Sequence, residues 1–210
     1  GQVTAIVGPP KSGKSALLKI LAGRLRMGRL TGTVATPAPQ GMAGYVPFGE
    51  ALAPTETVRE TIAFAAKLRR RVPVGTSSTT FAQTTAELVT DLCRSFGLRP
   101  NDRIATLSTS TKKRVAVAVE LATMPLALFL DEPVSPVTMD SVEAWTTIRL
   151  LKLAAAAAKI PIVCTMREPP SEVFAELGNI VFLSLDGRVA YAGMASGLDA
   201  AMASAGVPVP

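Results

Sequence analysis

The feature that most constrains this chain is a short loop rich in glycine and lysine, set between a strand-like and a helix-like segment. Residues 2–7 form a β-branched apolar run that predicts a buried strand, and residues 13–24 have the apolar spacing of a helix. The loop between them reads Gly-Pro-Pro-Lys-Ser-Gly-Lys-Ser, which matches the pattern G-x-x-x-x-G-K-[ST]. This strand–loop–helix context predicts a phosphate-binding loop; the alternative is a Gly-Pro turn without a ligand.

The pattern assigns a role to each part of the loop. Backbone N–H groups at the start of the helix surround a phosphate, the ammonium group of Lys14 reaches the β- and γ-phosphates, and the Ser15 hydroxyl faces Mg²⁺. We therefore expect ATP and Mg²⁺ as ligands. The expected nucleotide-binding residues are Gly8, Pro9, Pro10, Lys11, Ser12, Gly13, Lys14 and Ser15.

A second motif is an apolar run, residues 126–130, that ends in two adjacent carboxylates. If this run is a strand parallel to the first, Asp131 lies at the same sheet edge as the phosphate-binding loop and can hold Mg²⁺ through water. Glu132 is then the candidate catalytic base that polarises the attacking water. Read alone, the Asp-Glu pair also fits a plain helix start.

Strands alternate with helices along the chain, which indicates an α/β fold with a mainly parallel core sheet. Thr57 and Glu60 form a capping-box pattern that starts a helix to about residue 70, and we expect an exposed linker at 73–80. Further helices are expected at 84–96, 110–124 and 141–158, strands at 31–36, 44–46 and 160–166, a hairpin at 179–191, and a last helix before the end.

The whole chain, residues 1–210, is expected to be one domain, in which residues 57–124 form a helical lobe. The strand-like start and the lack of a secretory signal pattern suggest a piece of a longer chain. The best apolar stretch, 115–130, is interrupted by Glu120 and Pro125, so we expect no membrane span within this sequence.

Composition narrows the chemistry further. The sequence contains no histidine, which excludes histidine-based catalysis. Cys93 and Cys164 lie in apolar runs without metal-ligand spacing and are expected to be buried free thiols in a reducing compartment. The formal net charge is +6, but no aromatic residues interleave with the basic clusters, so nucleic acid is not an expected partner.

Beyond the two motifs, further segments follow one another along nearly the whole chain in a characteristic order. They are Tyr45–Phe48, Pro54-Thr55, Thr57–Thr61, Phe64–Arg69, Lys113–Leu121, Asp131–Pro133, Cys164–Met166, Pro169–Phe174, Gly187–Gly193 and the close at residues 206–210. This order resembles the ATP-binding cassette (ABC) transporters of the G subfamily, the white and pleiotropic-drug-resistance type. The resemblance implies the P-loop NTPase, ABC-ATPase fold of a transporter's nucleotide-binding domain.

Several positions depart from the family pattern. The expected Leu-Ser-Gly-Gly signature reads Leu-Ser-Thr-Ser, with Ser108, Thr109 and Ser110 where bare glycine backbone approaches the partner domain's nucleotide. Phe48 stands in place of the glutamine that senses Mg²⁺ and water, and Arg167 in place of the switch histidine. The residues after Pro133 also differ from the expected Ser-Gly-Leu-Asp, unless Asp140 supplies the aspartate after an insertion.

The resemblance implies a domain that pairs head to tail with a second nucleotide-binding domain and works with transmembrane domains at the cytoplasmic face of a membrane. A dimer of two copies of this chain would carry the altered residues at both nucleotide sites. This favours a partner domain with a different sequence. Three functions stay open: an engine that hydrolyses ATP slowly, a regulatory half that holds ATP without turnover, and a soluble ABC ATPase of translation or repair. The aromatic residue that stacks on adenine in this family would lie upstream of residue 1.

Overall fold

A computed structural model defines the fold, and it describes residues 2–25, 29–35, 41–49, 51–71, 74–135, 139–204 and 206. The strands are β1 (Val3–Val7), β2 (Ala43–Val46), β3 (Ala127–Leu130), β4 (Ile162–Met166), β5 (Asn179–Leu183) and β6 (Val189–Met194). The helices are α1 (Lys14–Leu21), α2 (Val58–Arg69), α3 (Ser78–Ser95), α4 (Thr109–Leu121), α5 (Ser141–Ala158), α6 (Ser171–Glu176) and α7 (Leu198–Ser204), with 3-10 turns at Ile104–Thr106 and Ala195–Gly197.

The strands form one sheet in the order β2-β3-β4-β1-β5-β6. The pairs from β2 to β5 are parallel, and β6 runs antiparallel to β5. The expected α/β class is confirmed, with a mainly parallel core and one antiparallel hairpin. Because the parallel strands point the same way, the loops that follow β1, β2, β3 and β4 gather at one edge of the sheet.

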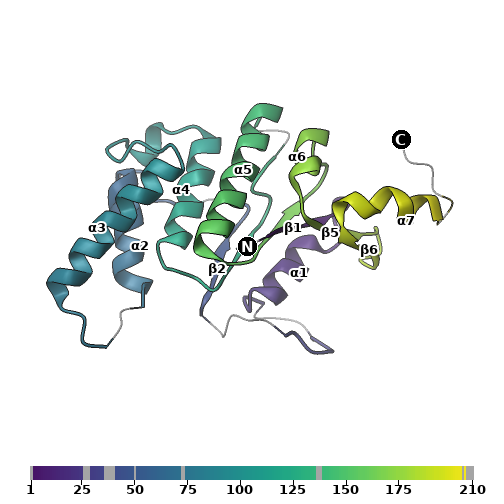
Figure 1. Ribbon diagram of the computed structural model, residues 1–210, viewed down its shortest axis with the longest axis horizontal. Coiled ribbons are helices and arrows are strands. Elements are labelled where there is room, and N and C mark those ends of the chain that lie inside the picture. Colours follow the sequence, from purple (N-terminus) through teal and green to yellow (C-terminus); the bar gives the residue numbers. More distant parts are fainter. Residues whose placement is uncertain are drawn as a thin grey trace.

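Helices cover both faces of the sheet. Figure 1 shows α1 on one side, and α5 and α6 on the other, with α2, α3 and α4 grouped beyond the β2 edge. The side chains of β1 alternate between the two faces of the sheet. Ala5 and Val7 belong to the buried cluster that also contains residues of α5. Ile6 packs instead in the cluster that contains Leu18 of α1. Burial on both faces explains why the core strands read as continuous apolar runs.

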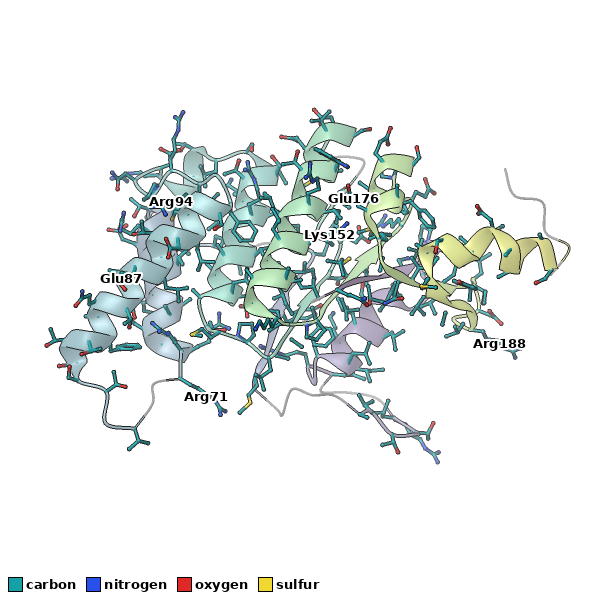
Figure 2. The ribbon with its side chains drawn as sticks, in the orientation of Figure 1. Arg71, Glu87, Arg94, Lys152, Glu176 and Arg188 are labelled. Atoms are coloured by element: carbon teal, nitrogen blue, oxygen red, sulfur yellow. The ribbon has the colours of Figure 1, made fainter. Side chains whose placement is uncertain are left out.

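Helices α5 and α6 pack against each other on one face of the sheet. Lys152 of α5 forms an ion pair with Glu176 of α6 at 2.5 Å, and both side chains are labelled in Figure 2. The short helix α6, which the sequence pattern did not predict, starts directly after Pro170. The pair ties α6 to the longer helix beside it.

Two sequence predictions about local structure are wrong. Residues 31–35 contain no strand, and Thr36 lies outside the described residues. Val34 is 38% exposed, so this segment lacks the buried face that would hold a strand in the sheet. Helix α3 begins at Ser78 rather than at residue 84, because the Ser77 side chain accepts a hydrogen bond from the backbone N–H of Thr80 at 3.1 Å and caps the helix earlier.

Other predictions are confirmed. Residues 44–46 lie in β2, which pairs in parallel with β3 in the core sheet. Helix α2 carries the predicted capping box, in which Thr57 and Glu60 bond each other's backbone N–H groups. Both cysteines are buried free thiols. Among the described residues, we find no helix with both the length and the apolar character that a bilayer-spanning segment needs.

Candidate functional site

The loop between β1 and α1 is shaped by close approach of its backbone to neighbouring groups. A Cβ atom at Gly8 would lie 2.5 Å from the carbonyl oxygen of Leu183, so only glycine fits there. Gly13 adopts φ of 87°, a left-handed conformation that favours glycine, directly before the first residue of α1. The loop therefore curls tightly and turns its backbone toward the start of the helix.

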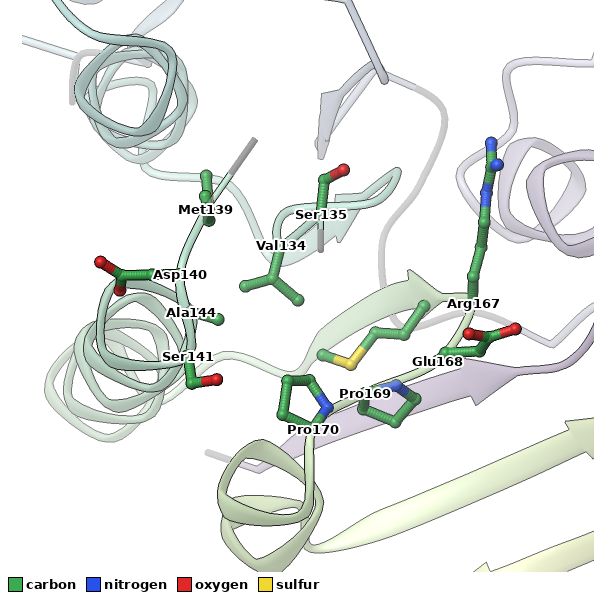
Figure 3. A pocket seen from close by; sticks show the side chains of 11 residues that line it. Val134, Ser135, Met139, Asp140, Ser141, Ala144, Arg167, Glu168, Pro169 and Pro170 are labelled. Carbon is green, nitrogen blue, oxygen red and sulfur yellow. The ribbon is translucent and has the colours of Figure 1, made fainter. Parts of the chain in front are cut away.

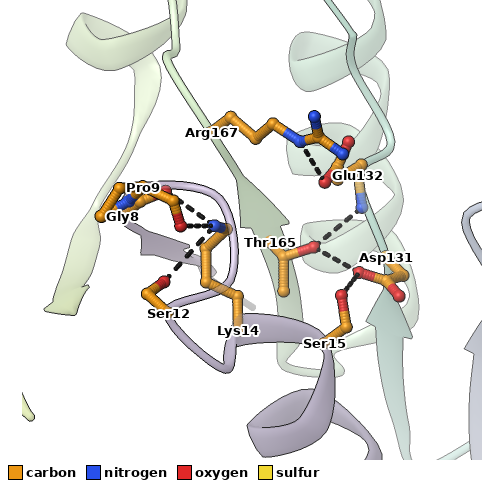
Figure 4. Close-up of polar contacts among 9 residues, drawn as sticks. All are labelled: Gly8, Pro9, Ser12, Lys14, Ser15, Asp131, Glu132, Thr165 and Arg167. Atoms are coloured by element: carbon orange, nitrogen blue, oxygen red, sulfur yellow. Dashed lines mark hydrogen bonds and ion pairs between the residues drawn. The ribbon is translucent and has the colours of Figure 1, made fainter. Parts of the chain in front are cut away.

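The ammonium group of Lys14 lies inside this loop. Its Nζ donates to the carbonyl oxygens of Gly8 and Pro9, both at 2.7 Å, and lies 3.5 Å from Ser12 Oγ (Figure 4). Burial lowers the pKa of Lys14, and the carboxylate of Glu132 opposes that shift. A positive charge thus lies within a ring of backbone groups, where an anion can replace the carbonyl contacts.

Asp131 follows β3 and meets the first turn of α1. Its Oδ1 accepts hydrogen bonds from Ser15 Oγ at 2.8 Å and from Thr165 Oγ1 at 2.7 Å. Its Oδ2 accepts from the hydroxyl of Tyr45 at 3.4 Å. The structure therefore brings together Ser15 and Asp131, the two residues predicted to hold Mg²⁺.

Sequence reasoning missed two residues of this cluster, Thr165 and Tyr45. Both lie at or near the carboxyl ends of β4 and β2, the strands that flank β3. In the sheet register Leu130 lies opposite Cys164, so Asp131 and Thr165, the next residues, come side by side. Burial raises the pKa of Tyr45 to about 12, and the nearby Asp131 adds to the shift. A polar residue at or near the end of each predicted strand marks both as candidates, but only the strand order shows that they meet Asp131.

Glu132 lies next to Asp131 but faces a different partner. Its Oε1 accepts a hydrogen bond from Nε of Arg167 at 2.7 Å, and its backbone N–H donates to Thr165 Oγ1 at 2.9 Å (Figure 4). The side chain of Glu132 is 12% exposed and that of Arg167 is 48% exposed. The hydrogen bond to Glu132 raises the pKa of Arg167. The candidate base is therefore paired with a guanidinium group.

An open pocket of about 450 Å³ lies beside these groups. Its lining consists of Pro10, Lys11, Gly13, Lys14, Ser15, Ala16, Glu132 and Arg167, so three cationic residues and one carboxylate border the same space. The oxygens of Ser15 and Asp131 are the hard ligands that Mg²⁺ prefers. The donor set fits a nucleoside triphosphate with a magnesium ion.

Comparisons with known proteins agree with this geometry. A family model described as "ABC transporter" matches residues 1–135. The chain belongs to the ABC transporter family. It is also similar to ABC transporter G family member 13 of Arabidopsis thaliana, with 34% identity over 100% of this chain and 31% of that protein. ABC transporter G family member 5 of Dictyostelium discoideum is 33% identical over 92% of this chain and 13% of its own length.

A third relative, ABC multidrug transporter I of Aspergillus fumigatus, is 34% identical over 92% of this chain and 13% of its own length. The chain thus spans less than a third of each of these relatives. Together with the strand–loop–helix unit and Asp131, these matches identify the chain as a nucleotide-binding domain of the ABC family, similar to its G subfamily.

Phe48, which departs from the family's glutamine, does not line the pocket of the phosphate loop. Phe48 as a whole residue is 57% exposed. Lys113 of α4 donates to the carbonyl oxygens of Pro47 at 3.1 Å and Phe48 at 2.5 Å, and its Nζ lies 5.7 Å from the ring centroid. The loop after β2 is therefore held by α4 and turns an apolar ring outward.

The altered signature residues also lie away from this pocket, at the start of α4. Ser108 caps the helix by accepting a hydrogen bond from the N–H of Thr111 at 3.3 Å. Thr109 is exposed, whereas Ser110 is buried and donates to Glu143 of α5 at 2.9 Å. This hydrogen bond fixes the start of α4 against α5.

The segment after Pro133 leads into a smaller pocket of about 290 Å³ beside Arg167 (Figure 3). Residues 136–138, within the stretch after Pro133 that departs from the family pattern, lie outside the described residues. Asp140 caps α5, accepting a hydrogen bond from the N–H of Glu143 at 2.7 Å. The assignment of Asp140 to the family aspartate stays a prediction.

Proposed function

We propose that this chain binds ATP with Mg²⁺ and supplies one of the nucleotide sites of an ABC transporter of the G subfamily. The observation that carries the proposal is that Lys14 and Ser15 line one pocket, and that Ser15 Oγ donates to Asp131 Oδ1 at 2.8 Å beside it. The names of the G-family relatives favour a transporter over a soluble ABC ATPase of translation or repair.

In this proposal, the loop from Gly8 to Ser15 encloses the phosphates. Lys14 exchanges the carbonyl oxygens of Gly8 and Pro9 for the β- and γ-phosphate oxygens, and the N–H groups at the start of α1 complete the cradle. Ser15 and Asp131 hold Mg²⁺, which neutralises charge on the phosphates when bound. The aligned N–H groups and the buried ammonium are in place before the ligand arrives.

Hydrolysis depends on Glu132, which must accept a proton from the attacking water. Nε of Arg167 donates a hydrogen bond to Oε1 of this carboxylate at 2.7 Å. The guanidinium group of Arg167 stays charged and, unlike a neutral imidazole, cannot accept a proton. Phe48 brings no polar group to the pocket. We therefore infer slow hydrolysis, since losing one well-placed transition-state contact costs about 10² to 10³ in rate. An ATP-holding half that does not turn over is the second candidate, and the Glu132–Arg167 pair is the observation that favours it.

We propose the same partners and location that the family implies: transmembrane domains and a second nucleotide-binding domain, at the cytoplasmic face of a membrane. The exposed Thr109 and the buried Ser110 replace bare glycine backbone at the surface that would face the second domain. This favours a partner domain with a different sequence. We also propose that residues 1–210 act as one domain, with 57–124 as its helical lobe.

The test is phosphate release by the full-length protein with its natural partner. Glu132→Gln removes the base and should stop any residual release while ATP binding persists. The double variant Arg167→His with Phe48→Gln should increase release, because it frees Glu132 and restores a polar group. Arg94→His on α3, where the side chain is 77% exposed, changes the same residue type far from the site and should have no effect.

The outcomes separate the two candidates. Release that is lost in Glu132→Gln establishes a slow engine. Release that is indifferent to Glu132→Gln, with ATP still bound, establishes the holding half and refutes hydrolysis at this site. If the double variant releases phosphate no faster than the wild-type protein, Arg167 and Phe48 do not limit the rate at this site.

A further inference from the structure

Helix α4 presents two charged side chains to β2 and to the loop that follows it. Lys113 and Glu120 are seven residues apart and so lie on one face of the helix. Lys113 donates to the carbonyl oxygens of Pro47 and Phe48, and Glu120 Oε2 accepts the backbone N–H of Tyr45 at 3.3 Å. One helix face thus holds the segment from residue 45 to residue 48 at both ends.

Both charged side chains are largely shielded from solvent. Lys113 is 5% exposed, and the side chain of Glu120 is 12% exposed. Glu120 also pairs with Arg69 of α2 through two contacts, at 2.8 Å and 3.2 Å. A buried charge is costly unless it is paired and hydrogen-bonded, so this geometry resists change. Gly44 permits the close approach, because a Cβ there would lie 2.9 Å from Leu128 Cδ1 and 3.4 Å from Glu120 Oε2.

The strand held in this way also touches Asp131. The carbonyl oxygen of Val46 accepts the backbone N–H of Asp131 at 2.8 Å, and the Tyr45 hydroxyl donates to Asp131 Oδ2 at 3.4 Å. Ser15 and Thr165 both donate to the other oxygen, Oδ1. Tyr45 therefore supplies a donor to the second oxygen and limits rotation of the carboxylate.

We infer that Tyr45 is a positioning residue for Asp131, and that Glu120 and Lys113 set the strand that carries it. The inference rests on the proposed function, in which Asp131 holds Mg²⁺. The contacts of Lys113 and Glu120 with β2 and the loop that follows it connect α4, which begins at Thr109 directly after Ser108, to the metal site. A displacement of α4 would shift β2 and change how Asp131 faces the ion.

The test measures how strongly Mg²⁺ enhances binding of a fluorescent ATP analogue to the full-length protein. Tyr45→Phe removes the hydroxyl and should raise the Mg²⁺ concentration for half-maximal enhancement about threefold to tenfold, the effect of one lost hydrogen bond. Binding in EDTA, which requires only the phosphate loop, should not change. Tyr191→Phe is the matched control, since that hydroxyl bonds the carbonyl oxygen of Met194 in β6.

A second variant tests the link to α4. Glu120→Gln keeps an acceptor for the N–H of Tyr45 but removes the charge that pairs with Arg69, and it should shift the Mg²⁺ midpoint in the same direction. Binding of the analogue in EDTA reports that each variant is folded. If Glu120→Gln does not fold, Lys113→Met tests the same link with the same expectation.

The results separate this inference from the proposed function. A wild-type protein that does not bind the analogue refutes the proposed function itself. An unchanged Mg²⁺ midpoint in Tyr45→Phe, or an equal loss of binding with and without Mg²⁺, overturns the positioning role. A shift in Tyr45→Phe without one in the α4 variant overturns the link between α4 and the metal site.

Discussion

Replacing the buried hydroxyl of Thr165 by a methyl group should destabilise the protein markedly. Thr165 is fully buried at the end of β4. Its Oγ1 donates to Asp131 Oδ1 at 2.7 Å and accepts the backbone N–H of Glu132 at 2.9 Å. Valine has nearly the same shape, so Thr165→Val removes both hydrogen bonds and leaves the packing volume almost unchanged.

The size of the effect follows from the two partners. A hydrogen bond to a charged group contributes about 1.5–3 kcal/mol, and a buried N–H left without an acceptor costs about 1–3 kcal/mol. Burying one more methyl group offsets roughly 1 kcal/mol. The net loss in free energy of unfolding is therefore about 1.5–5 kcal/mol, which for a domain of this size lowers Tm by roughly 3–20 °C.

Thermal unfolding followed by circular dichroism measures this loss. Thr4→Val is the matched control, because Thr4 lies in β1 of the same sheet and its hydroxyl makes no hydrogen bond within the described residues. Thr4→Val should change the free energy of unfolding by less than about 0.5 kcal/mol. If Thr165→Val is as stable as Thr4→Val, the Thr165 hydroxyl does not hold Asp131 and Glu132 in the way described above.

Three further expectations follow from single positions. Gly8→Ala should weaken ATP binding by about tenfold or more, because the added Cβ would meet the carbonyl oxygen of Leu183 at 2.5 Å; fluorescent ATP titration checks it. Burial raises the pKa of Cys93, and that of Cys164 to about 12, so both thiols should react with Ellman's reagent at pH 8 only after unfolding in urea. Thr57→Ala removes the cap of α2 and should cost about 1 kcal/mol in urea unfolding.

Local patterns predicted the elements that carry their own signals. The helix expected at 141–158 matches α5, which Asp140 caps, and the Thr57–Glu60 box starts α2 as predicted. The errors arose where polar residues were taken as loop or strand. The Ser- and Thr-rich stretch before residue 84 is helical from Ser78, since a single cap at Ser77 is enough to start α3.

The candidate site was predictable in part. The motifs indicated that Lys14, Ser15 and Asp131 meet at one sheet edge, and these side chains do lie together. The contacts of Thr165 and Tyr45 depend on which strands flank β3 and in which register, and no local pattern reveals either. The pairing of Arg167 with Glu132 likewise requires β3 and β4 to be neighbours.

The measurement that tests the central claim most directly is equilibrium binding of ATP by the full-length protein and its Lys14→Ala variant. Lys19→Ala is the control, because Lys19 is an exposed lysine on the same helix and its loss changes the net charge equally. The account predicts that Lys14→Ala weakens ATP binding by roughly 10- to 150-fold, the value of a lost charge-assisted contact, while Lys19→Ala binds like the wild-type protein. Equal affinity in both variants would contradict it.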